Sequence, residues 1–345
     1  MRAVLFHEFG QPPEVTTVPD PACPADGVVV RVESTGLCRS DWHGWRGHDD
    51  AITLPHVPGH ELAGVIVVKG RAVRDWAVGD RVTTPFVLAC GRCGACARGD
   101  LQVCQRQLQP GFTQWGSYAE LVALPRADVN LVAVPEGIDS DVAAGLGCRF
   151  GTAYRAITQV ARVREGETVV VHGCGGVGLS AVMVAVARGA RVIAVDPAAE
   201  SLALARALGA EPVAASEDGA LLELTGGGAD VSLDAVGSPP SLAASLACLR
   251  PRGRHVQVGL FAGNDAAPRV DMGGVIAREL QLLGSHGLSA RAYPELLALV
   301  SAGVLDPGRL VRSRIGLREA AVRLPGLSAA GSGAGGVTII RPQED

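Results

Sequence analysis

The chain has 345 residues, of which 48% are hydrophobic and 19% are charged, and its net charge is −4 at pH 7. This length favours two domains, and the apolar content excludes a disordered chain. A slightly acidic chain lacks the positive field that attracts nucleic acid, so we expect no nucleic-acid partner.

The chain also lacks the signals of export and membrane insertion. The apolar run at the N-terminus is short and ends at His7 and Glu8, which does not fit a signal peptide. Its most apolar stretch, 169–187, is broken by His172 and four glycines, so it does not fit a membrane span. We therefore expect a soluble cytoplasmic protein with no membrane partner.

The first part of the chain, residues 1–146, predicts an irregular β-rich domain. Short segments rich in β-branched residues are separated by turn clusters such as Pro12-Pro13. The expected β segments are 3–6, 28–32, 62–68, 81–84 and 119–123.

The second part, residues 147–287, alternates β and helical segments. The expected strands are 168–172, 191–195, 211–214, 231–235, 254–258 and 281–284, with helical runs such as 176–188 and 198–208 between them. Six strands joined by helices predict a doubly wound parallel sheet, and therefore an α/β fold. The third part, residues 288–345, contains an expected helix at 292–301, a Ser/Ala/Gly tract at 328–336 that reads as a flexible surface loop, and a strand at 337–340.

Four of the nine cysteines lie in one short glycine-rich lobe, residues 88–106, as Cys90-x2-Cys93-x2-Cys96-x7-Cys104. Such a loop can place four sulfurs around one Zn²⁺ at about 2.3 Å. Four thiolates leave no open position, so this zinc would be structural. Two disulfides or unrelated core cysteines are the alternative, and disulfides are disfavoured in a cytosolic protein.

A glycine-rich turn follows the first strand of the second part. Its sequence is Gly173-Cys174-Gly175-Gly176-Val177-Gly178, a helix follows it, and Asp196 ends the next strand. In a dinucleotide site Gly173 would allow the tight turn, and Gly175 would let the backbone approach the pyrophosphate. Gly178 would let the helix pack closely on the strand. Asp196 would bind the adenosine ribose and repel a 2′-phosphate, which favours NAD over NADP. The alternative is a structural turn with an ordinary aspartate.

A second metal site is suggested by three residues that are far apart in the chain. Cys38, His60 and Cys148 together supply two thiolates and one imidazole. Three protein ligands and one open position are what a catalytic zinc requires. Singly, each residue is ambiguous, because a lone cysteine is usually a small core residue and a lone histidine is more often a satisfied side chain than a metal ligand.

With these motifs in this order, the whole chain resembles the zinc-containing medium-chain alcohol dehydrogenases, and the short connection after Cys104 resembles their bacterial, yeast-like tetrameric branch. The resemblance implies that Cys38, His60 and Cys148 bind the catalytic zinc. It implies that Glu61 can act as a transient ligand and that Asp41 orients His60.

The same resemblance implies a GroES-like catalytic domain to which residues 288–345 return, a Rossmann domain and a homo-oligomer, either tetramer or dimer. Besides Gly173, Gly175, Gly176, Val177, Gly178 and Asp196, it assigns cofactor contacts to Arg39 (pyrophosphate), Thr152 (near the nicotinamide) and Val258 (carboxamide). Many family members carry a basic residue before the last strand; here the sequence is Gly335-Gly336-Val337, so Arg39 would bind the pyrophosphate alone.

The implied reaction is hydride transfer from a small alcohol to NAD, with two zinc ions per chain. Ser40 would take the alcohol proton and pass it, through the nicotinamide ribose, to His43, which we expect to face solvent and to titrate near neutrality. The alternative is a turn serine and a surface histidine. A polyol or amino-alcohol dehydrogenase of the same superfamily, and a non-enzymatic NAD-binding zinc protein, are the competing functions.

Aromatic residues near the metal motifs suggest an apolar substrate cleft, although ordinary core packing explains them nearly as well. These residues are Trp42, Trp45, Phe86 and Trp115. No role is assigned to the remaining cysteines, Cys23, Cys174 and Cys248.

Overall fold

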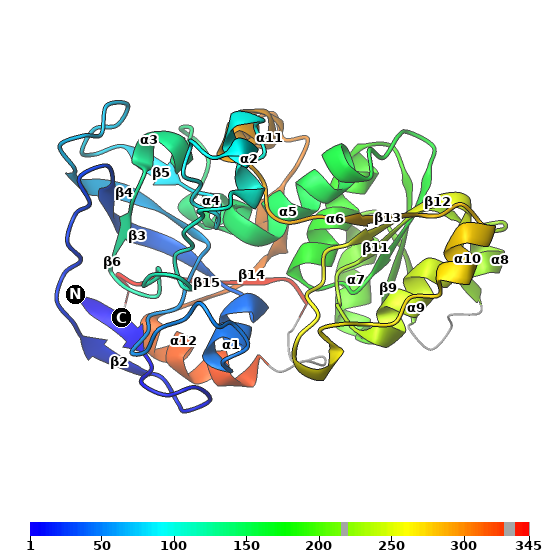
Figure 1. Ribbon diagram of the computed structural model, residues 1–345, viewed down its shortest axis with the longest axis horizontal. Coiled ribbons are helices and arrows are strands. Elements are labelled where there is room, and N and C mark those ends of the chain that lie inside the picture. The colour runs from blue at the N-terminus through cyan, green and yellow to red at the C-terminus, as the bar shows by residue number, and fades with distance from the viewer. Residues whose placement is uncertain (215–219, 328–334, 345) are drawn as a thin grey trace. The chain divides into compact units, whose positions relative to one another are not determined.

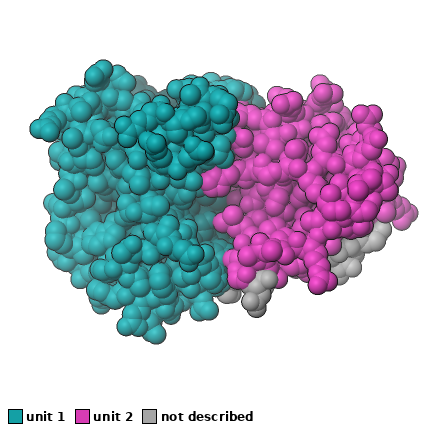
Figure 2. All heavy atoms as spheres, viewed as in Figure 1, with its two compact units in different colours: residues 1–151, 287–332, 337–345 teal, residues 152–286, 333–336 magenta. Residues whose placement is uncertain are grey.

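The computed structural model describes residues 1–214, 220–327 and 335–344, and the chain divides into two compact units. Unit 1 comprises Met1–Gly151, Gly287–Ser332 and Val337–Asp345, and unit 2 comprises Thr152–His286 and Gly333–Gly336 (Figure 2). The sequence predicts domain changes at 146/147 and 287/288, and the chain changes unit at 151/152 and 286/287. Most of the expected surface loop, 328–336, lies outside the described residues.

Unit 1 is built on a seven-stranded sheet with the order β14-β15-β3-β4-β5-β7, in which β6 also pairs with β3. Strand β3 (Val28–Leu37) is central, since β15, β4 and β6 all pair with it antiparallel. Its β-branched residues Val28, Val30 and Val32 are buried in the core of this unit. The other strands are β4 (Leu62–Lys69), β5 (Arg81–Thr83), β6 (Leu121–Leu124), β7 (Val132–Ala133), β14 (Val311–Ile315) and β15 (Val337–Ile340).

A separate hairpin of β1 (Arg2–Leu5) and β2 (Glu14–Thr17) belongs to the same unit. Helices fill the connections of unit 1, and most are short. They are α1 (Arg39–Trp45), α2 (Gly94–Ala97), α3 (Ala127–Asn130), α4 (Ser140–Gly145), α11 (Tyr293–Ser301) and α12 (Leu317–Arg323). A π-helical turn, η2 (Leu146–Phe150), follows α4 and leads into α5 (Gly151–Arg155), where the chain changes unit.

The C-terminal strands are tied into unit 1 by a buried carboxylate. Asp141 in α4 accepts hydrogen bonds from Ser34 Oγ at 2.6 Å, Arg314 Nε at 2.6 Å and Arg341 Nη2 at 2.9 Å. Burial alone would raise the pKa of Asp141, but the hydrogen bonds from Arg341, Ser34 and Arg314 outweigh it and lower the pKa. The C-terminal strands are therefore held to α4 by charge, while β15 also pairs with β3 and β14 pairs with β15.

Unit 2 is a six-stranded parallel sheet of order β10-β9-β8-β11-β12-β13, with helices packed on it (Figure 1). Its strands are β8 (Thr168–His172), β9 (Arg191–Asp196), β10 (Glu211–Ala214), β11 (Ala229–Asp234), β12 (Leu249–Gln257) and β13 (Gln281–Gly284). Its helices are α6 (Gly176–Ala187), α7 (Ala199–Ala207), α8 (Ala220–Leu224), α9 (Pro239–Ala247) and α10 (Met272–Ala277).

The predicted α/β class, with a β-rich domain and a doubly wound parallel sheet, is confirmed. Strand β12 begins earlier than the expected 254, because Arg250–Gly253 form an excursion that the periodicity does not show. No helix among the described residues is both long enough and apolar enough to cross a bilayer.

Candidate functional site

The first donor residue, Cys38, lies where the central strand of unit 1 turns into a helix. Strand β3 ends at Leu37, and Cys38 keeps an extended backbone as the residue that precedes α1. Asp41, in the first turn of α1, accepts a hydrogen bond from Cys38 N at 3.1 Å. The thiol is buried, and its direction is therefore set by the junction of strand and helix.

The second donor, His60, is oriented by Asp41, which is only 1% exposed. Asp41 Oδ1 lies 2.8 Å from His60 Nδ1 and accepts Gly59 N at 3.0 Å, while Oδ2 accepts the Tyr118 hydroxyl at 2.7 Å. A carboxylate surrounded by donors can only accept, so Nδ1 of His60 carries its hydrogen. The lone pair of the imidazole is thereby placed on Nε2, the nitrogen that a metal would bind.

The third donor, Cys148, comes from the π-helical turn η2, a wide turn of the kind often found at functional sites. One donor atom from each of Cys38, His60 and Cys148 lies within 4.8 Å of the other two. The structure therefore brings together three residues that the sequence separates by up to 110 positions.

Buried atoms at this group fit a zinc ion. Nε2 of His60 is buried and has no hydrogen-bond partner among the described residues, a costly state unless a cation occupies the space. Burial disfavours protonation of His60, but the Asp41 carboxylate outweighs it and raises the pKa of the ring, so Nε2 attracts positive charge. Hydrogen bonding between the two thiols lowers the pKa of Cys38, so one sulfur is readily a thiolate. Two sulfurs and one imidazole leave a fourth position open.

Glu61, predicted as a transient ligand, is not a member of this group. Its fully buried carboxylate is held by Arg149, which contacts it through Nε at 3.0 Å, through Nη2 and through its backbone nitrogen at 2.8 Å. Burial works against the charge of Arg149, but the Glu61 carboxylate raises the pKa of the guanidinium. A Cβ at Gly36 would overlap both the carboxylate and the guanidinium, which explains the glycine there.

The predicted relay residues lie on α1. Ser40 is half-buried in the first turn, and His43 lies three residues further along, on the same face. His43 differs from the expectation of a solvent-facing group that titrates near neutrality. It is half-buried, its Nδ1 lies 3.0 Å from Nδ1 of the exposed His48, and burial, then the charges of Arg39 and His48, lower the pKa of His43 to about 4.

The aromatic residues divide between the site and the core. The ring of Phe86 lies 6.2 Å from that of His60, and the ring of Phe112 lies 5.2 Å from it. Trp42 contacts the rings of His43 and His48. Two others lie elsewhere: Trp45 is a core residue whose indole donates to Gln11 O, and Trp115 is partly exposed and donates to Pro55 O.

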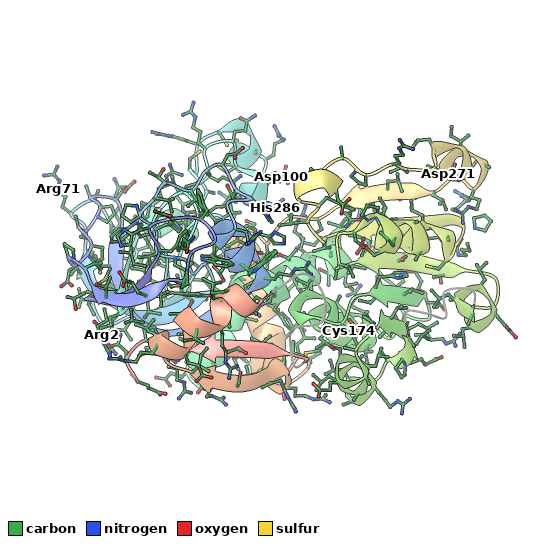
Figure 3. The ribbon with its side chains drawn as sticks, turned by 90° about the horizontal axis from the view of Figure 1, so that it is seen from below. Arg2, Arg71, Asp100, Cys174, Asp271 and His286 are labelled. Carbon is green, nitrogen blue, oxygen red and sulfur yellow. The ribbon has the colours of Figure 1, made fainter. Side chains whose placement is uncertain are left out.

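The lobe with four cysteines forms a second donor group, Cys90, Cys93, Cys96 and Cys104. Neighbouring Sγ atoms lie 3.5, 3.7 and 4.0 Å apart, far beyond the length of a disulfide bond, so these four cysteines are not paired as disulfides. A tetrahedron with Zn–S bonds of about 2.3 Å has edges of about 3.8 Å, so these spacings fit a four-thiolate zinc. Asp100 of this lobe is labelled in Figure 3.

Backbone amides support thiolates in the same lobe. Cys104 Sγ accepts Cys90 N at 3.2 Å and Arg106 N at 3.3 Å. The backbone amides of Cys96 and Gln105 lower the pKa of Cys93 to about 6. Gly91 and Gly99 have φ of +72° and +92°, which lets the chain turn tightly enough to close the group.

In unit 2 the glycine-rich turn joins β8 to α6. Gly173 has φ of +88°, and a Cβ at Gly178 would overlap Gly173 O, so both glycines are required by the turn itself. A Cβ at Gly175 would meet no protein atom, so the space over this exposed residue is open to a ligand. Half-buried Gly176 and Val177 begin α6, where unpaired N–H groups suit a pyrophosphate.

The other predicted cofactor residues are spread over both units. Asp196 ends β9, and its two oxygens accept Cys174 N at 2.7 Å and Ala198 N at 2.8 Å, so the carboxylate is fixed beside the turn. Val258 follows β12 and donates to Asp234 O at 3.0 Å, and Thr152 is buried in α5. Arg39 is exposed at the start of α1 in unit 1.

The leftover cysteines have structural surroundings. Cys174, labelled in Figure 3, is buried in the glycine turn, where burial raises the pKa of its thiol. Cys248 lies 3.7 Å from His172 Nε2 inside unit 2, and Cys23 is half-buried near Gly27 O.

Sequence reasoning missed Tyr118, Arg149 and Phe112, which complete the surroundings of the first donor group. Tyr118 and Phe112 have no local signal, since they reach the group from other parts of the fold. The arginine directly after Cys148 was the one available hint, because a charge beside a buried ligand needs a partner.

Comparisons with known proteins agree with this geometry. Residues 24–136 match the family model of the alcohol dehydrogenase GroES-like domain, and residues 176–302 match that of the zinc-binding dehydrogenases. A probable zinc-binding alcohol dehydrogenase of Mycobacterium tuberculosis is 36% identical over 93% of this chain and 84% of its own length. The L-threonine 3-dehydrogenase of Streptomyces coelicolor is 32% identical over 94% of each chain.

Two solved structures show the same fold. The alcohol dehydrogenase from Thermus sp. ATN1 is 31% identical, with a TM-score of 0.89, over 99% of this chain and 100% of that one. A zinc-binding dehydrogenase from Sinorhizobium meliloti, bound to NADP, is 28% identical with a TM-score of 0.88 over 99% of both chains.

Proposed function

This chain belongs to the zinc-binding alcohol dehydrogenase family, and from that premise we propose that it interconverts primary or secondary alcohols and the matching aldehydes or ketones with NAD. The observation that carries the proposal is the group of Cys38, His60 and Cys148, whose donor set fits a zinc ion with one open position. Bound zinc would act as a Lewis acid toward the alcohol oxygen, and NAD would accept the hydride.

The chain's own residues would orient the substrate and keep the site dry. Phe86 and Phe112 flank His60 with apolar rings, which favours a hydrocarbon substituent over a polyol. Asp41, with its four donors, holds His60 in the tautomer that binds a metal. Arg149 holds the Glu61 carboxylate and so keeps this acid away from the open position.

The proton would leave along α1. Ser40 would take it from the alcohol oxygen, and His43, neutral because its pKa is lowered to about 4, would accept it. Once protonated, His43 can donate from Nδ1 to Nδ1 of His48 at 3.0 Å, and His48 is exposed to solvent. The histidine pair thus gives a path from a half-buried base to water.

The choice of NAD over NADP rests on Asp196. Its carboxylate is fixed by two backbone amides, and the following residues, Pro197, Ala198 and Ala199, supply no arginine for a 2′-phosphate. We therefore expect kcat/KM to be at least about a hundredfold higher with NAD, a difference of roughly 3 kcal/mol.

The test is an assay of the zinc-loaded enzyme with ethanol, 1-butanol, 2-butanol, benzyl alcohol, sorbitol and L-threonine, each with NAD and with NADP, following nicotinamide absorbance. Turnover of the simple alcohols with NAD supports the proposal. A preference for sorbitol or threonine, or equal use of NADP, contradicts it. Cytoplasmic location and a dimer or tetramer stay predictions, which cell fractionation and light scattering can check.

A further inference from the structure

Unit 2 contains a polar cavity at the amino edge of its parallel sheet. The cavity measures about 350 Å³, and each described residue that lines it has a polar side chain, charged in all but one case. The residues that line it are Arg164, Glu167, Arg250, Arg252, Arg254 and Gln281. The glycine-rich turn follows the opposite end of β8, about 16 Å away for a strand of five residues, so this cavity is not part of the dinucleotide site.

The fold gathers these arginines through an irregularity of β12. Ala229 of β11 pairs with Leu249, and Val231 pairs with Arg254, so Arg250–Gly253 leave the regular ladder opposite the single residue Asp230. Non-glycine residues with positive φ border the same edge: Arg162 at +53°, Arg252 at +62° and Glu279 at +49°. Such backbone strain is concentrated at functional sites, and of these three residues Arg252 lines the cavity.

Carboxylates neutralise only part of this positive charge. Arg250 Nε is paired with Asp230 at 2.7 Å, and Arg254 Nη2 with Glu167 at 2.6 Å. The pKa of Asp230 is lowered, because hydrogen bonds from Thr168 and Arg250 and the nearby positive charges outweigh its burial.

Two arginines keep donors for a ligand. Arg252 lies 3.6 Å from Glu279 with both side chains more than three-quarters exposed, which makes a weak pair. Arg164 forms no ion pair within the described parts of the chain, and its hydrogen bonds with Glu167 use its backbone nitrogen and carbonyl oxygen. Arg254 Nη2 is buried and, despite its ion pair, makes no directed hydrogen bond among the described residues.

We propose that this cavity is a binding site for a phosphorylated small molecule. Planar guanidinium groups match the oxygens of a phosphate, and a phosphate group carries nearly two negative charges at neutral pH. The volume falls within the range of small-molecule pockets and leaves room for an organic body beyond the phosphate. The polar side chains of the lining suit a hydroxylated body such as a sugar.

The proposal can be tested by calorimetric titration at constant ionic strength. The zinc-loaded enzyme is first saturated with NAD, which blocks the dinucleotide site. The probes are glucose 6-phosphate, glucose and inorganic phosphate. We expect glucose 6-phosphate to bind saturably, more tightly than phosphate, and glucose not to bind. Absence of saturable binding overturns the site, and equal binding of inorganic phosphate overturns the organic ligand.

Variants of opposite charge sharpen the test. Arg164→Gln with Arg252→Gln should weaken binding of glucose 6-phosphate about tenfold or more, because charge-assisted hydrogen bonds are lost. Glu167→Gln should strengthen it several-fold, because Arg254 loses its competing carboxylate. Arg206→Gln with Arg269→Gln, and separately Glu165→Gln, make the same changes of charge at exposed residues of unit 2 outside the cavity lining, and they should leave affinity unchanged. Equal effects of cavity and control variants would show non-specific attraction and contradict the proposal.

Discussion

The two donor groups of unit 1 differ in how the chain builds them. Cys90, Cys93, Cys96 and Cys104 come from one loop, and turns and backbone amides of the same loop hold their sulfurs. Cys38, His60 and Cys148 come from the end of β3, the segment before β4 and the turn after α4. Their positions depend on buried polar residues from elsewhere, above all Asp41, Tyr118 and the Glu61–Arg149 pair.

Because the two groups are built differently, metal binding should have different consequences for the protein at each of them. A local loop with few apolar residues has little to hold it together besides its ion, so metal binding contributes directly to folding. The dispersed group is held by a sheet, helices and a buried polar network that exist without the ion. We therefore expect loss of the metal from the four-cysteine lobe to reduce stability, and loss of the metal from the dispersed group to reduce catalysis.

The largest effect is expected for Cys38→Ser. Loss of one thiolate should lower kcat/KM for alcohol oxidation at least about a thousandfold, because the Lewis acid is lost or displaced. The melting temperature should change little, since the surrounding network stays intact. Steady-state kinetics and thermal unfolding check this pair of outcomes. A large fall in melting temperature would remove the contrast between the two groups.

Cys93→Ser should produce the converse result. We expect the melting temperature to fall by about 10 °C or more, with zinc content reduced by one ion per chain. Elemental analysis and calorimetry measure both, and activity per folded molecule should stay close to that of the native chain at low temperature. Unchanged stability with the zinc lost would mean that the lobe folds without its metal.

Asp41→Asn keeps the shape of the residue but replaces an acceptor oxygen by a donor next to His60. The affinity of the catalytic group for zinc should fall about ten- to a hundredfold. A competition assay with a chelator measures it, and the four-cysteine group is the internal control because its zinc should be retained. Equal loss of both ions would contradict a specific role for Asp41.

The smallest effect concerns the histidine pair. His43→Gln should lower kcat for alcohol oxidation about tenfold, and His48→Gln should lower it less, since solvent can replace an exposed acceptor. Because the pKa of His43 is lowered to about 4, this ring stays neutral from pH 6 to 9, and the shape of the pH–rate profile should not change. If the native pH–rate profile has a limb near neutrality that is absent in His43→Gln, the low pKa of His43 is contradicted.

The sequence reveals the local features of this protein more completely than the distant ones. The four-cysteine motif and the glycine-rich turn can both be recognised from spacing, because the residues of each motif lie close together in the sequence. The spacing alone could not join Cys38, His60 and Cys148, which are grouped by the chemistry of their donor atoms and by the family resemblance. Tyr118 and Arg149 could not be placed, because their partners are set by the pairing of strands rather than by spacing. The burial of His43 depends on a turn at Gly47 that brings His48 back beside it.

The Glu61–Arg149 pair also constrains how this protein can evolve. Losing either partner alone leaves a buried charge, at a cost of about 3–5 kcal/mol, a large share of a typical domain's 5–15 kcal/mol. Replacing both by apolar residues is often nearly neutral, so these positions change readily only as a pair. Gly36 shares their fate, because its missing side chain makes room for both charged groups. Three positions far apart in the chain are therefore energetically coupled, and a substitution at one of them is tolerated better after a compensating change at another.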